Sequence, residues 1–124
     1  MSSPARIAVL TVLTLRVAYG AALIAAPARV TRRWLGPGAA APAPQVALRG
    51  LGAREIALHG LAIAAALRGA PVRPYLAASI AGDLADIGAT VGGRRGLPEG
   101  SATATVLVAG GSALTSAAVA RATR

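Results

Sequence analysis

Four long apolar runs dominate this chain and leave few folds open to it. They are separated by turns rich in Gly and Pro, and they cover residues 7–26, 45–67, 75–92 and 102–120. Each run approaches or reaches the roughly 17–25 residues that a helix needs to cross about 30 Å of hydrocarbon. The sequence therefore predicts an all-α integral membrane protein, a four-helix bundle that forms a single domain over residues 1–124.

A soluble helical bundle is the structural alternative, and it would require a polar face on each helix. The last run, SATATVLVAGGSALTSAAVA, has only Ser and Thr as polar groups, and their hydroxyls can bond to their own helix backbone in lipid. The first run exceeds the roughly 7–15 apolar residues of a signal peptide and contains Arg16, so we expect it to be retained. The pattern favours a multi-pass protein of the cell membrane.

The net charge of +9 lies at the ends of the apolar runs. Ten arginines and Glu99 lie outside the runs and account for the whole net charge. In a four-span arrangement five of these arginines lie on each side of the membrane, so the positive charge does not indicate the orientation of the protein. Trp34, in the basic segment 28–36, suits an anchor at the level of the lipid headgroups. Because aromatic platforms for bases are few, the expected partner is the lipid bilayer and not nucleic acid.

Seven ionisable side chains interrupt the runs and are the candidate functional residues. They are Arg16 in the first run; Arg49, Arg54, Glu55 and His59 in the second; and Asp83 and Asp86 in the third. A charged residue at mid-helix costs about 2.5–3.5 kcal/mol on insertion scales, so these groups should face inward and pair. We expect Glu55 to bridge to Arg16 or Arg49. We also expect Arg54 to bridge to an aspartate.

Helical geometry places these groups on particular faces. Glu55 and His59 are one turn apart, which favours a hydrogen bond between them, and Asp83 and Asp86 share a face of the third run. Small residues such as Gly52 allow close helix packing in membranes. The pattern predicts a cluster between the first three runs, with the second and third as direct neighbours.

The stretches GAREIALHG at 52–60 and GDLADIG at 82–88 resemble an uncharacterised family of small four-span membrane proteins from bacteria and fungi. In that family a Gly-Ala-Arg-acid motif opens the second span and an Asp lies in the third. The resemblance implies a four-helix membrane bundle in which Arg54, Glu55 and one of the two aspartates match the family pattern. His59 departs from that pattern, and the resemblance implies no activity.

Three functions fit these residues. The first is a structural or accessory membrane protein whose polar cluster specifies assembly. The second is a membrane-embedded acid–base enzyme of the cyclase, isomerase or epoxide-opening type, which would act on a lipophilic small molecule. In it Asp83 or Asp86 would be the general acid, and Glu55 would be the base or would orient the acid. The groups that hold the substrate would be Arg16, Arg49, Arg54 and His59.

The third function is a proton-linked carrier, which in a chain of 124 residues would need a homo-oligomer to provide two access states. A metal site is not expected. The chain has one His and no Cys, and three arginines near the candidate carboxylates would repel a cation. No cofactor is predicted.

Overall fold

The computed structural model describes residues 1–123, which fold entirely into helices and the turns between them. The all-α prediction is confirmed. The four long helices follow the four apolar runs closely: α1 (Ser3–Ala25), α4 (Pro42–Leu67), α5 (Arg73–Gly93) and α6 (Ser101–Ala122). Short helical segments connect them: α2 (Pro27–Val30), α3 (Arg32–Leu35), η1 (Gly36–Ala40) and η2 (Arg94–Gly96).

Proline and glycine set the ends of the long helices. Pro4, Pro42 and Pro74 lie in the first turns of α1, α4 and α5, where the missing N–H is not needed. Gly69 ends α4 with a φ of 70°, and the N–H of Ala70 donates to the carbonyl of Ala65 at 2.9 Å. This is a Schellman motif, which satisfies the last carbonyls of α4 and turns the chain back into α5.

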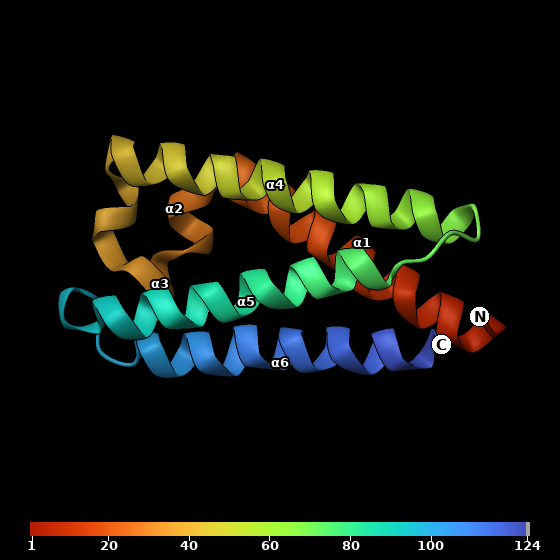
Figure 1. Ribbon diagram of the computed structural model, residues 1–124. Helices are drawn as coiled ribbons and strands as arrows, with labels where there is room; N and C mark the ends of the chain where they lie inside the picture. Colours follow the sequence, from red (N-terminus) through yellow and green to blue (C-terminus); the bar gives the residue numbers. More distant parts are fainter. Residues whose placement is uncertain (124) are drawn as a thin grey trace.

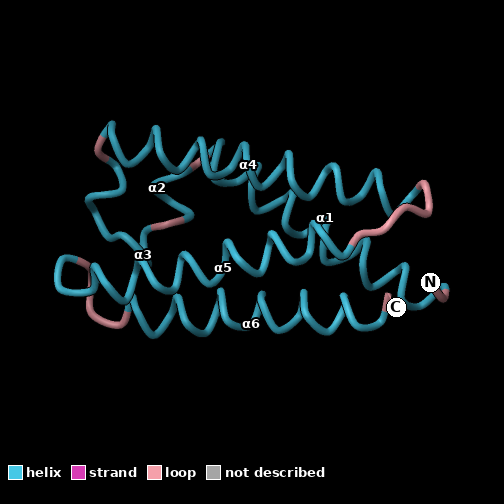
Figure 2. The backbone as a smooth tube through the Cα atoms, viewed as in Figure 1, coloured by secondary structure: helices cyan, strands magenta, loops and turns pink. Residues whose placement is uncertain are grey.

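The four long helices run alternately up and down, so both described ends of the chain and the loop 68–72 lie at one end of the bundle (Figure 1). The short helices α2 and α3 lie at the opposite end, as does the turn between α5 and α6 (Figure 2). Packing is closest within two pairs, α1 with α4 and α5 with α6. Helices α4 and α5 meet over a short stretch only, so the close neighbour of the second run is the first run and not the third.

Two glycines explain the close pairing of α1 with α4. A Cβ added at Gly20 would lie 2.7 Å from the carbonyl oxygen of Gly52, and one added at Gly52 would lie 2.5 Å from that of Gly20. By contrast Gly82 and Gly88, on α5, have no neighbouring atom within 4 Å of such a position. The small residues of α5 therefore do not admit α4, whereas those of α1 and α4 admit each other.

The outside of the bundle carries mostly apolar side chains, with Arg49 and Arg54 exposed on α4, and the inside is partly polar. One apolar core lies at the end that holds the loop 68–72 and the other beside α2 and η1: Val9, Leu13, Ala62, Ala65, Ala66, Val72, Leu76 and Val119 in the first, and Leu23, Ala39 and Leu48 in the second. Between them lie the buried polar residues His59, Ser79 and Asp83. The outward faces carry exposed leucines, with Leu61 57% and Leu84 58% accessible.

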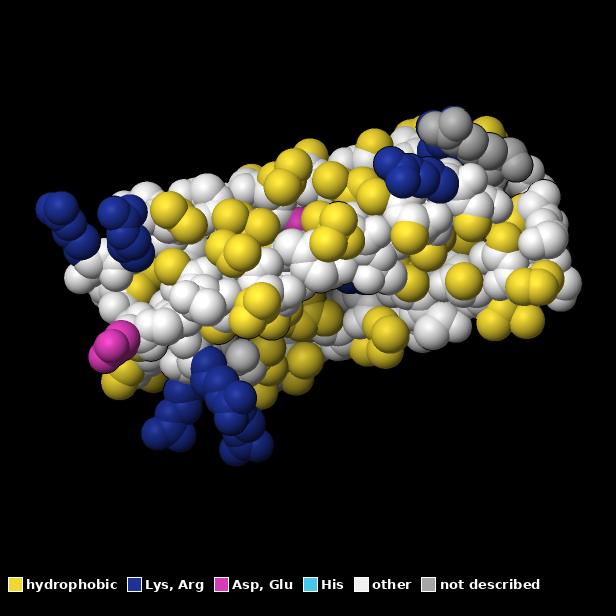
Figure 3. Space-filling model, turned by 90° about the horizontal axis from the view of Figure 1, so that it is seen from below, with side chains coloured by type: hydrophobic (Ala, Val, Ile, Leu, Met, Phe, Trp, Pro, Cys, Tyr) yellow, Lys and Arg dark blue, Asp and Glu magenta, His cyan; other side chains and the backbone are white. Residues whose placement is uncertain are grey.

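The outer surface has the pattern of a protein in a bilayer. In Figure 3 apolar side chains cover the middle of the face shown, and arginine side chains gather toward its two ends. Among residues 1–123, the helices α1, α4 and α6 are long and apolar enough to cross a membrane. Helix α5 does not reach the same hydropathy, because Asp83 and Asp86 lie near its middle.

Candidate functional site

Arg16 is the centre of a buried polar network that joins all four long helices. From α1, its Nη1 donates to Asp83 Oδ1 on α5 at 2.9 Å and to Ser112 Oγ on α6 at 2.7 Å. Its Nη2 donates to Ser79 Oγ on α5 at 3.0 Å. Its Nε lies 3.2 Å from Glu55 Oε2 on α4, which forms an ion pair. A single guanidinium group thus contacts the three other long helices, and the expected bridge from Glu55 to Arg16 is present.

His59 is the most deeply buried ionisable group of this network, with its side chain 1% exposed. Its Nδ1 lies 2.8 Å from the backbone carbonyl oxygen of Glu55, which can only accept, so Nδ1 carries the hydrogen. Its Nε2 then accepts from Ser79 Oγ at 3.0 Å and from Arg16 Nε at 3.4 Å. These partners define a neutral imidazole of one tautomer, and the expected hydrogen bond to Glu55 is made to its backbone.

The network contains one guanidinium group and two carboxylates. Asp83 makes the direct pair with Arg16, and its side chain is 5% exposed. The side chain of Glu55 is 14% exposed, and its Oε2 forms an ion pair with Arg16 and lies 3.5 Å from Nδ1 of the neutral His59, without a hydrogen bond among residues 1–123. Asp83 alone therefore balances the charge of Arg16, and the charge of Glu55 is not required for neutrality.

Arg49 and Arg54 lie outside the network, on exposed positions of α4. The Nε of Arg49 donates to the backbone carbonyl of Ile24 at 3.3 Å, which ties α4 to the end of α1. Within residues 1–123 Arg54 has no ion pair with an aspartate, because its side chain is exposed and α4 meets α5 over a short stretch only.

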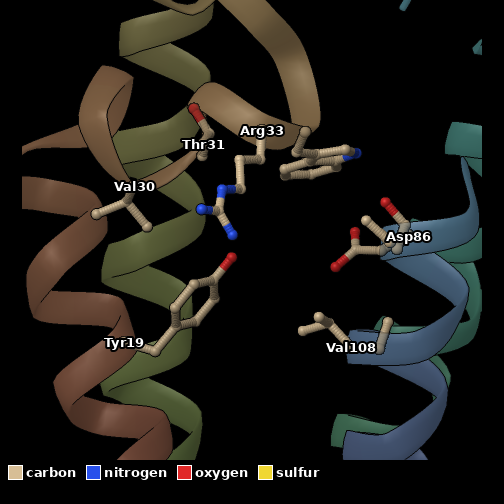
Figure 4. Close-up of a pocket in the computed structure, with 10 residues that line it drawn as sticks. Tyr19, Val30, Thr31, Arg33, Asp86 and Val108 are labelled. Carbon is tan, nitrogen blue, oxygen red and sulfur yellow. The ribbon is translucent and has the colours of Figure 1, made fainter. Parts of the chain in front are cut away.

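A cavity of about 340 Å³ lies next to the network, toward the end of the bundle that holds α3. Tyr19 of α1, Asp86 of α5 and Arg33 of α3 direct their polar groups into it, and Val108 of α6 forms part of its apolar wall (Figure 4). Asp83 and Glu55 do not line this cavity. The three candidate carboxylates are thus divided: Asp83 and Glu55 contact Arg16, and Asp86 reaches the cavity.

Helix α3 closes this end of the cavity because two hydrogen bonds hold it in place. The indole Nε1 of Trp34 donates to Thr90 Oγ1 on α5 at 2.8 Å. The backbone carbonyl of Trp34 accepts from Ser101 Oγ at the start of α6. Both hydroxyl groups are buried. The basic segment expected to lie at the membrane interface is therefore fixed to the α5–α6 pair.

The residues of the two sites that were not predicted from the sequence include Ser79 and Ser112 in the network and Tyr19 and Arg33 at the cavity. Ser79 lies four residues before Asp83, so helical periodicity could have placed it on the same face. No comparable signal existed for Arg33, because its position depends on how α3 folds back onto α5 and α6.

Comparisons of the chain with protein-family models, with curated proteins and with solved structures find no match. Function must therefore be argued from geometry. The network has the chemistry of an interhelical connection, since Arg16 joins side chains of α4, α5 and α6. Among residues 1–123, Glu55 Oε2 and Asp83 Oδ2 are buried there without a hydrogen bond. The cavity offers a carboxylate, a phenol and a guanidinium group to a ligand. Among residues 1–123, no three His, Asp or Glu side chains are placed to hold a metal ion.

Proposed function

We propose that this protein is an integral protein of the cell membrane that crosses it four times and has a structural or accessory role. The observation that carries this proposal is the partly buried guanidinium group of Arg16, 15% exposed, which bonds to residues of α4, α5 and α6. In a membrane the hydrophobic effect does not drive helices together, so packing and polar contacts between helices specify the bundle. The Arg16 network supplies such contacts at mid-bundle.

Helix α5 is the fourth span in this proposal, although its hydropathy is lower than that of the other three. The charge of Asp83 does not argue against crossing, because Asp83 faces inward and is paired with Arg16 at 2.9 Å, whereas Asp86 lines the cavity and has no ion pair among residues 1–123. On the opposite side Leu84 is 58% exposed and would face lipid. Twenty-one residues at about 1.5 Å per residue give α5 the length to cross the hydrocarbon layer.

Labelling of single cysteines tests this arrangement directly, because the native chain contains no cysteine. Ala70→Cys lies in the loop before α5, and Glu99→Cys lies in the loop after it. With four spans, a membrane-impermeant maleimide should label these two cysteines from opposite sides of sealed vesicles. Labelling of both from the same side would show that α5 does not cross, and the proposal would fail. Leu107→Cys, on the outward face of α6, is the matched control and should resist labelling from either side.

An acid–base enzyme acting on a lipophilic substrate is the second candidate, and one observation favours it. Asp86 reaches a cavity with apolar walls, and the phenol of Tyr19 lines the same cavity. In such an enzyme Asp86 would exchange a proton with the bound substrate. Asp83 and Glu55, which contact Arg16, would hold the helices in place.

A further inference from the structure

The cavity beside α3 combines opposite charges with apolar walls. Asp86 projects from α5 on one side, while Arg33 and Tyr19 come from the other side (Figure 4). Among residues 1–123 no hydrogen bond or ion pair is formed by the Asp86 carboxylate, the Arg33 guanidinium group or the Tyr19 hydroxyl. These groups contrast with those around Arg16, where the partners are other side chains of the protein.

The charged and aromatic side chains of the cavity determine which charged groups of a ligand would bind there. A ligand cation suits Asp86, and the aromatic rings of Tyr19 and Trp34 in the same lining favour an ammonium group further through cation–π contacts. A ligand anion suits Arg33, whose planar guanidinium group binds phosphate through two parallel hydrogen bonds. The complementary ligand is therefore a zwitterion that carries both an ammonium group and a phosphate.

The position of the cavity indicates that this ligand has apolar chains. Val108, on its wall, is 74% exposed on the outer face of α6, so the cavity opens sideways at the surface that would face lipid. Trp34 and the arginines of α3 mark the level of the headgroups. A lipid could thus place its headgroup inside and leave its acyl chains in the bilayer.

We propose that the cavity binds the headgroup of a zwitterionic membrane phospholipid, with the ammonium group at Asp86 and the phosphate at Arg33. This inference rests on the proposed location in a membrane, which the cysteine labelling tests separately. The volume of about 340 Å³ is at the lower end of the range for ligand sites. It suits a headgroup better than a whole lipid.

Trp34 provides a built-in reporter, because it lines the cavity and is the single tryptophan of the chain. The protein would be reconstituted into phosphatidylglycerol vesicles that contain a fixed minor fraction of lipid brominated on its acyl chains. Brominated phosphatidylethanolamine should quench Trp34 more strongly than brominated phosphatidylglycerol. The expected preference is about fivefold in relative association constant, equivalent to about 1 kcal/mol, as for one partly buried cation–π or charge contact.

Two variants with matched controls assign this preference to the cavity. Asp86→Asn should abolish the preference for phosphatidylethanolamine, whereas Glu99→Gln, which removes an exposed carboxylate elsewhere, should retain it. Arg33→Gln should weaken binding of the phosphate, whereas Arg95→Gln, an exposed arginine outside the cavity, should not.

Several results would overturn the proposal. Equal quenching by the two brominated lipids would mean that Trp34 meets only the general lipid surroundings. Stronger quenching by phosphatidylglycerol would mean that the site selects an anion without an ammonium group. A preference that survives in both Asp86→Asn and Arg33→Gln would place binding elsewhere. Because the comparison of the two lipids uses the unmutated protein, it tests the preference for phosphatidylethanolamine even if a variant fails to fold.

Discussion

The Arg16 network and the neighbouring cavity use the same kinds of side chain in opposite ways. Asp83 and Asp86 lie three residues apart on α5, yet Asp83 is paired with Arg16 and buried, while Asp86 lines a cavity. Arg16 makes bonds to three other helices, while Arg33 reaches the cavity without a bonded partner among residues 1–123. Groups bonded to one another stabilise the bundle, and groups left without partners are available to a ligand.

The difference follows from how the two helix pairs meet. Near the described ends of the chain, side chains such as Leu13, Ala62 and Leu76 fill the space between the pairs with an apolar core. At the other end α2 and α3 lie between the pairs, and α3 packs on α6 (Figure 1). The short helices keep the α1–α4 pair apart from the α5–α6 pair at that end. Asp83 and Asp86, one turn apart on α5, therefore meet different surroundings: Asp83 meets Arg16, and Asp86 meets the cavity.

The largest effect is expected from Arg16→Gln, because this change leaves Asp83 and Glu55 buried without a cation. Removing one partner of a buried ion pair costs about 3–5 kcal/mol of the free energy of unfolding. Unfolding in mixed detergent micelles, followed by circular dichroism, would measure the loss. Arg49→Gln is the control, since Arg49 is exposed and makes one hydrogen bond to a backbone carbonyl. Equal stability of the two variants would contradict a structural role for the network.

The two carboxylates of the network should differ in a second experiment. Asp83→Asn removes the charge that balances Arg16 and should cost about 2–3 kcal/mol, the range for a lost hydrogen bond to a buried charged group. Glu55→Gln should cost about 1 kcal/mol or less, because Asp83 still balances Arg16 in that variant. The same unfolding assay applies to both. A larger loss in Glu55→Gln would mean that Glu55, and not Asp83, is the principal partner of Arg16.

A smaller effect is expected from Ser112→Ala, which removes the contact of α6 with Arg16. The hydroxyl accepts from Nη1 at 2.7 Å, and loss of a hydrogen bond to a charged group should cost about 1.5 kcal/mol. Thr115→Ala is the matched control on the same helix, because Thr115 is exposed and bonds to the carbonyl of Gly111 in its own helix. Thr115→Ala should change stability by less than about 0.5 kcal/mol. Equal effects would show that α6 is held by packing alone.

Hydropathy and helical periodicity were sufficient to predict the long helices and an ion pair of Glu55 with either Arg16 or Arg49, of which the structure has the pair with Arg16. Apolar runs fix where helices form, and the cost of an unpaired charge in lipid requires Arg16 to face inward. The choice of helix neighbours was not predictable in this way. It depends on the contact between Gly20 and Gly52, and the glycines of α5 make no such contact.

The different surroundings of Asp83 and Asp86 could not be predicted from the sequence either. Residues at i and i+3 lie about 60° apart around a helix, so both were expected to face the same neighbour. That angle is enough to direct one carboxylate to Arg16 and the other to the cavity once α3 holds part of the bundle open. The positions of Trp34 and Arg33 come from tertiary hydrogen bonds to Thr90 and Ser101, which no local pattern indicates.

Asp86→Asn should have the smallest effect on stability and is the sharpest test of the contrast with Asp83. Because Asp86 has no bonded partner among residues 1–123, its replacement by the neutral isostere should change the free energy of unfolding by no more than about 0.5 kcal/mol. An increase in stability would also agree, since charges that serve binding are commonly kept at a cost to the fold. The comparison requires both aspartate variants in one unfolding series. If Asp86→Asn destabilised the protein as much as Asp83→Asn, both carboxylates would stabilise the fold. That result would contradict the proposal that the cavity is a binding site.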